Sequence, residues 1–198
     1  MDYLKQIFQK WLSEAGLSEY QTEVVSVYLL FAVVILAAIV LYFVTKRILL
    51  RVVHQLAKKS KTDWDDKLIE NKFFSYLSYL APALFIYVFT PTVLEQFPKA
   101  IAFFLTALEI YLIIIILLVI NSFLNAIGAI YQDFKIARTK SIKGYIQIVK
   151  VIAIFIAIII IFASLLDQSP WGLLGGLGAF TAVLLLIFDL GLFLLLHY

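Results

Sequence analysis

The sequence contains no cysteine and only two histidines, His54 and His197, which lie far apart. The absence of cysteine excludes disulfide bonds, cysteine-ligated zinc and thiol catalysis, and two isolated histidines do not indicate a histidine-rich metal site. Charged residues make up only 15% of the 198 residues, and a net charge of +3 is too small to indicate a nucleic-acid-binding protein. Catalytic signatures are also missing: the sequence has no HExxH, no GxSxG, no phosphate-binding loop and no pair of aspartates within its apolar runs. We therefore expect neither an enzyme nor a bound cofactor.

Apolar residues are in excess, at 64% of the chain against roughly 45–50% in soluble domains. They are concentrated in long runs, and a helix needs about 20 apolar residues to cross the hydrocarbon core of a bilayer. We predict an all-α integral membrane protein with five transmembrane helices, at 24–47, 73–91, 99–130, 145–166 and 172–196. No basic segment precedes the first run, so we expect that run to remain as a spanning helix and not to be removed as a signal peptide.

Lysine and arginine are distributed unequally between the loops. Thirteen of the 16 follow the first and third apolar runs, and only three lie on the opposite side. Because these residues accumulate on the cytoplasmic side of a membrane, the distribution predicts five crossings with the N-terminus outside and the C-terminus inside.

The segment 1–22 precedes the first run and has its own pattern. Its apolar residues recur at helical spacing: Leu4, Ile7, Phe8, Trp11 and Leu12. The spacing predicts an amphipathic helix that lies at the membrane interface. The alternative is a terminus that faces a partner or is poorly ordered.

Two acidic residues stand out within or beside the apolar runs. Glu109 lies about nine residues into the third predicted helix, and a charge at that depth is a candidate functional group. It could serve as a proton or cation site, pair with a polar residue of another helix, or stay protonated or reach the outer interface. The position of Asp189 depends on where the fifth helix ends. Asn121, Asn125 and Gly128 form a polar and small stripe in the third helix, which hydrogen bonds between helices would explain.

The fifth run begins with a cluster of glycines. Four of the eight glycines fall within seven residues: Gly172, Gly175, Gly176 and Gly178. Glycine costs a helix about 1 kcal/mol relative to alanine, but in lipid it lets helix backbones approach closely. One interpretation is that copies of this helix pack around an axis, and that the apolar segment 183–188 lines an opening that blocks ions by dewetting. The other is an ordinary contact between two helices of one protomer.

Several segments carry a family resemblance in combination. They read KTDWDD at 61–66, LAPALFIY at 80–87, KGYIQIVK at 143–150, LLDQSPW at 165–171 and GLGAFTAVLLLIF at 176–188. The sequence resembles the MscS-type mechanosensitive ion channel family, and within it the bacterial miniconductance subgroup with five membrane helices.

The resemblance implies a heptamer in the bacterial inner membrane that opens under membrane tension and releases solutes in hypo-osmotic shock. Membrane lipids and further copies of the chain would then be the partners, and nucleic acid, cofactors and catalysis would have no part. The last helix would line the pore, with a packing face of Gly175, Gly176, Gly178, Ala179 and Ala182. The apolar gate would fall at Leu185 or Leu186.

The sequence departs from the family after Phe188, where a Lys-Asp pair is expected and the segment 189–198 follows instead. Family members continue into a β-rich cytoplasmic domain that this sequence lacks, so we expect a truncated membrane domain with a frameshifted or artificial tail. Two alternatives stay open. One is a non-conducting membrane module or scaffold, and the other is a small transporter that uses Glu109 as a coupling site.

Overall fold

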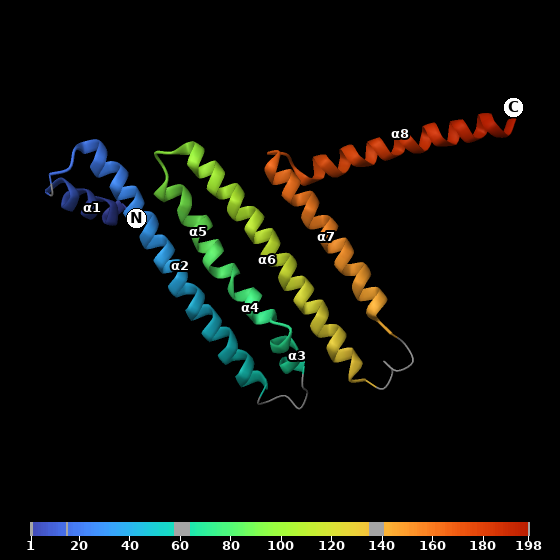
Figure 1. Cartoon of the computed structure of the whole chain (residues 1–198), viewed down its shortest axis with the longest axis horizontal. Helices are drawn as coiled ribbons and strands as arrows, with labels where there is room; N and C mark the ends of the chain where they lie inside the picture. Colours follow the sequence, from blue (N-terminus) through green and yellow to red (C-terminus); the bar gives the residue numbers. More distant parts are fainter. Residues whose placement is uncertain (1, 15, 58–63, 135–140, 198) are drawn as a thin grey trace. The chain divides into compact units, whose positions relative to one another are not determined.

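The computed structural model describes residues 2–14, 16–57, 64–134 and 141–197 (Figure 1). These residues form helices and connecting turns, with no strand among them. The helices are α1 Asp2–Glu14, α2 Glu19–Ala57, α3 Trp64–Glu70, α4 Phe73–Ser78, α5 Leu80–Val93, α6 Pro98–Gln132, α7 Lys143–Leu165 and α8 Pro170–His197. The all-α prediction is confirmed. Contacts group the chain into two units, Met1–Ala153 and Ile154–Tyr198, each described by itself below.

Five stretches of the described residues are long and apolar enough to cross a membrane, as predicted. They are Glu19–Val52, Phe73–Val93, Pro98–Gln132, Lys143–Leu165 and Pro170–Leu190. Such segments fold as helices in lipid because every backbone N–H and C=O must find its partner within the segment. The chain therefore has the helices of a multi-pass membrane protein.

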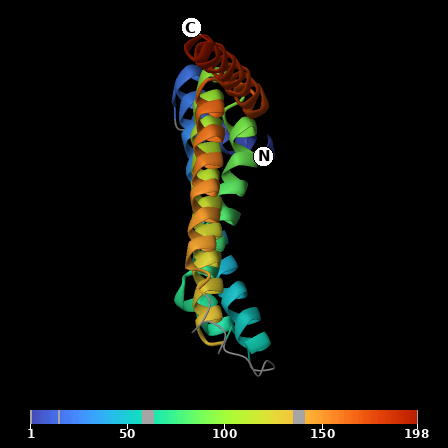
Figure 2. The same ribbon diagram turned by 90° about the vertical axis from the view of Figure 1, so that its right-hand side faces the viewer.

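The core of the first unit lies between α2, α5 and the start of α6. Helix α2 packs against α5, and α5 packs against α6 (Figures 1 and 2). Leu30 and Val34 of α2 are buried against Val93, at the end of α5. The rings of Phe31 and Phe104 lie 5.3 Å apart and add an aromatic contact between α2 and α6.

The first spanning helix is longer than predicted at both ends. It begins at Glu19 because Ser18 and Gln21 form a capping box: Gln21 N donates to Ser18 Oγ at 3.4 Å, and Ser18 N donates to Gln21 Oε1 at 3.2 Å. The helix continues to Ala57, so the basic residues Arg47 and Arg51 are helical and not in a loop. The short helix α3 follows within the segment that the sequence had suggested to be a loop. Six of the basic residues that set the predicted orientation lie outside the described residues: Lys58, Lys59, Lys61, Lys135, Arg138 and Lys140.

The N-terminal segment is a helix that ends at Glu14, and a turn follows at Gly16, whose φ is +85°. Helix α1 packs against α2, and its Phe8 joins the core of the first unit. Trp11 is 75% exposed. The apolar stripe is therefore divided between the protein core and the surface, and a location at the membrane interface stays a prediction.

The second predicted span is two helices, α4 and α5, which meet at Tyr79. The backbone forms a tighter turn there, because Tyr79 N donates to the carbonyl of Tyr76, three residues earlier, at 3.1 Å. Ser78 Oγ also donates to the carbonyl of Phe74 at 2.6 Å. Pro82 is consequently the third residue of α5 and not the middle of one long helix. Its missing N–H costs little in the first turn, where backbone N–H groups have no partner within the helix.

The second unit contains the later part of α7 and all of α8. Asp167 has a φ of +51° and turns the chain after α7, and Gln168 N donates to the carbonyl of Ala163 at 2.9 Å. Ser169 then caps α8 by accepting a hydrogen bond from Gly172 N at 3.0 Å, and Pro170 occupies the first helical position. Helix α8 therefore begins at Pro170, two residues before the predicted start.

Candidate functional site

Helix α8 presents its glycines on an exposed surface. A Cβ atom added at Gly175, Gly176 or Gly178 would meet no heavy atom within 4 Å. Gly172 differs, because a Cβ there would lie 3.1 Å from the Ser169 hydroxyl that caps the helix. Within their own unit, the three glycines after Gly172 therefore serve no close contact.

The remaining residues of the predicted packing face and gate are exposed as well. Ala179 and Ala182 lie on the surface of α8, and Leu185 and Leu186 are 66% and 68% exposed. Gly175, Ala179 and Ala182 follow one another at spacings of four and three residues, so they share one face of the helix. Gly176 and Gly178 lie about 160° apart around the helix, one on either side of this face, so small residues are available on several sides of α8 for contact with other helices.

Asp189 lies inside α8, which continues to His197. At 1.5 Å per residue, its Cα is about 28 Å along the axis from Pro170, which is close to the thickness of the hydrocarbon core of a bilayer. Asp189 is also exposed. A straight helix across the bilayer would therefore bring this carboxylate to the headgroup region.

Glu109 is half-buried and bonded to a polar residue of another helix. Tyr87 of α5 donates its hydroxyl hydrogen to Glu109 Oε1 of α6 across 3.2 Å. Of the three interpretations that the sequence left open, this geometry matches the pairing of Glu109 with a polar residue of another helix. Tyr87 was missed as the partner, although the short connection between Val93 and Pro98 makes α5 and α6 antiparallel neighbours and could have pointed to it.

The polar stripe of α6 contacts two other elements of the first unit. Asn125 Oδ1 accepts a hydrogen bond from Lys150 Nζ of α7 at 2.5 Å. One turn along, a Cβ added at Gly128 would lie 3.0 Å from Cδ1 at the end of the Ile146 side chain of α7. Ser122 donates to the backbone carbonyl of Asn71. Asn121 is exposed. Sequence reasoning placed Lys150 among the loop charges and so missed it as a partner of Asn125.

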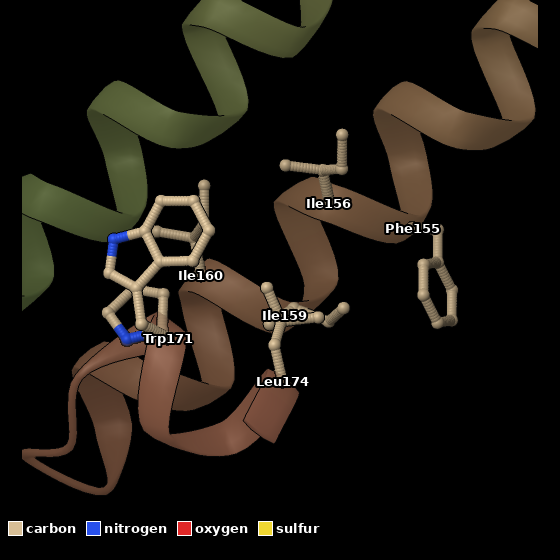
Figure 3. Close-up of a pocket in the computed structure, with 7 residues that line it drawn as sticks. Phe155, Ile156, Ile159, Ile160, Trp171 and Leu174 are labelled. Atoms are coloured by element: carbon tan, nitrogen blue, oxygen red, sulfur yellow. The ribbon is translucent and has the colours of Figure 1, made fainter. Parts of the chain in front are cut away.

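The second unit also has a small apolar cavity of about 190 Å³ between its two helices. Figure 3 shows Trp171 and Leu174 of α8 beside Ile159 and Ile160 of α7. Every residue that lines the cavity is apolar, so it offers no group to orient a polar substrate. In the described ranges, moreover, no three residues among His, Asp and Glu gather where they could hold a metal ion.

No family model matches the sequence, and no solved structure matches the fold. The resemblance to the MscS-type channels therefore rests on the sequence segments alone and stays a prediction.

Proposed function

We propose that the chain is the membrane domain of an MscS-type mechanosensitive channel in which copies of α8 surround a central pore. The observation that supports this most is that the small residues of α8 are exposed and that Gly175, Gly176 and Gly178 have no close contact in their own unit. In lipid, apolar surface alone does not drive helices together, and close packing through glycine and alanine does. In a ring, small residues on one side of α8 can pack against small residues on a different side of the neighbouring copy.

The angular positions on α8 assign a direction to each leucine of the gate. At about 100° per residue, Leu186 lies midway between Gly176 and Gly178, about 80° from each. A helix in a ring contacts two neighbours. The direction midway between its two contact faces points toward the axis of the ring. If Gly176 and Gly178 face the two neighbours, Leu186 faces the pore. Gly175, Ala179 and Ala182 then lie on the pore side as well, within about 40° of Leu186. Leu185 lies about 20° from Gly178 and so belongs to a contact face.

The apolar side chains would close such a pore by excluding water. Leu186 and its copies would form a constriction that is too dry for ions until the ring widens. Membrane tension favours the state with the larger area in the membrane plane, so it would open the pore and release solutes in hypo-osmotic shock. We further propose a bacterial inner-membrane location, an outside N-terminus and a heptamer, which follow from the basic-residue distribution and the resemblance.

The test combines assembly with conduction. The full chain is purified in mild detergent, its mass is measured by native mass spectrometry, and the protein is reconstituted in liposomes for patch recording under suction. We expect an oligomer and a current that appears only under tension. A monomer without tension-gated current would rule out the channel for this chain, whereas an intact oligomer without current would favour the non-conducting module.

The bond between Tyr87 and Glu109 keeps a transporter as the second candidate. A carboxylate inside a spanning helix is the group that proton-coupled transporters use. The substitution Glu109→Gln separates the two functions, because it removes a titratable carboxylate and preserves the shape of the side chain. A transporter would lose coupled flux, and a tension-gated pore would retain its current.

A further inference from the structure

A polar pocket lies where α6 ends and α7 begins, and it uses no residue of α8. Its volume is about 320 Å³, and it is lined by residues of α6 and α7 and by Asn71, which follows α3. A second pocket of about 210 Å³ shares Gly128, Gln132 and Lys143 with it. All these residues belong to the first unit. The pocket is not part of the proposed pore helix and calls for a separate explanation.

The lining is positively charged and rich in hydrogen-bond donors. Lys143 and Lys150 supply two ammonium groups, and no carboxylate is among the lining residues that the structure describes. Side-chain amides come from four residues: Asn71, Asn125, Gln132 and Gln147. Ammonium and amide N–H groups together favour a phosphate, whose oxygens accept several charge-assisted hydrogen bonds.

Lys150 already has one hydrogen-bond partner beside the pocket. Its Nζ donates to Asn125 Oδ1 at 2.5 Å, and the side chain is half-buried. An ammonium group carries three N–H donors, so two are left for a ligand after this bond.

The position along α7 points to a lipid as the source of the phosphate. Lys143 and Lys150 are about 10 Å apart along the helix axis, and the charge-free apolar run begins directly after Lys150. Val151, the first residue of this run, is exposed. A phosphate between the two lysines would lie at headgroup level, and the acyl chains could extend into the bilayer beside the apolar run that begins at Val151.

We propose that this pocket binds the phosphate group of an anionic glycerophospholipid between Lys143 and Lys150. Basic pockets between membrane helices bind anionic headgroups by this combination of charge and shape. The proposal needs only that the chain lies in a bilayer, and it does not depend on whether α8 forms a pore.

The first experiment compares three ligands on the purified full chain in mild detergent. Thermal unfolding is measured with phosphatidylglycerol, with phosphatidylcholine of the same acyl chains, and with inorganic phosphate. We expect phosphatidylglycerol to raise the unfolding temperature and the other two to have little effect, because a ligand stabilises the state that binds it. An equal effect of phosphatidylcholine would overturn the proposal. An equal effect of inorganic phosphate would assign the pocket to a free anion and overturn it too.

Variants then locate the effect. The double substitution Lys143→Gln and Lys150→Gln should raise the half-saturating phosphatidylglycerol concentration at least about tenfold, since it removes two charge-assisted contacts. Asn125→Asp preserves an acceptor for Lys150 but places a negative charge beside the phosphate, so it should weaken binding as well. The matched control is Lys99→Gln, which removes an exposed lysine at the opposite end of α6.

The control should bind phosphatidylglycerol as the wild type does. If the folded variants also bind it with wild-type affinity, the pocket is not the binding site. Should the double variant fail to fold, Asn125→Asp decides the question on its own, because it preserves the contact between α6 and α7.

Discussion

Two glycine-bearing regions of the molecule use the same residue in different ways. At Gly128, α6 already has a neighbour, and an added Cβ would lie 3.0 Å from Ile146 Cδ1. At Gly176 and Gly178, the space around an added Cβ is open. Both sites bear the cost of glycine in a helix, but only at Gly128 would a larger side chain meet a side chain of its own unit. The comparison shows that composition alone does not reveal whether a small-residue face serves folding or assembly.

The largest effect on stability is expected at the close contact. Gly128→Leu should destabilise the folded protein by about 1–3 kcal/mol, because the new side chain overpacks the contact with Ile146. Thermal unfolding in detergent measures the change, and Ile146→Ala in the same chain should restore part of it. Gly175→Leu is the control, since open space surrounds that position. Equal losses for the two glycine variants would erase the distinction between the regions.

Assembly of the oligomer, in contrast to the stability of the folded chain, should depend on the glycines of α8. Gly178→Leu should lower the association constant of the oligomer by about tenfold or more, equivalent to about 1.4 kcal/mol, because bulk prevents close approach of helices. Native mass spectrometry and crosslinking measure the oligomer, and circular dichroism checks that the helix content is unchanged. Oligomers that persist at wild-type levels would show that this face of α8 is not the assembly surface.

Within α8, the two gate leucines should differ. Leu186→Asn should lower the tension needed for opening, because a polar side chain at the constriction helps water to enter. Leu185→Asn is the matched control on the neighbouring residue and should leave the threshold closer to that of the wild type. Patch recording under graded suction compares them. The reverse order of thresholds would mean that Leu185, and not Leu186, faces the axis.

The smallest effect concerns the hydrogen bond between α5 and α6. Tyr87→Phe removes the hydroxyl that donates to Glu109 and should cost about 0.6 kcal/mol, the average for such bonds between membrane helices. Thermal unfolding is the measurement, and Tyr28→Phe is the control, because Tyr28 is exposed on α2. A cost above about 2 kcal/mol would indicate that Glu109 depends on this tyrosine more than an ordinary interhelical bond allows.

The sequence by itself determined the number of long apolar helices and their approximate positions. Each apolar run in lipid must satisfy its own backbone, and this requirement leaves the helix as the outcome for a run of about 20 residues. Local signals also determine two helix starts, at Ser18 with Gln21 and at Ser169 with Pro170, because caps act within one turn of the chain.

Only the tertiary structure decided which polar residues meet. The bonds of Tyr87 with Glu109 and of Lys150 with Asn125 depend on how neighbouring helices are rotated and shifted against one another. Helices that are apolar on all sides carry little periodic signal for that rotation, so the sequence leaves it open. The break at Tyr79 is likewise decided by packing, since α4 and α5 each have contacts of their own with α2 and α6. Contacts between helices, and not the helices themselves, are what the fold adds to the sequence.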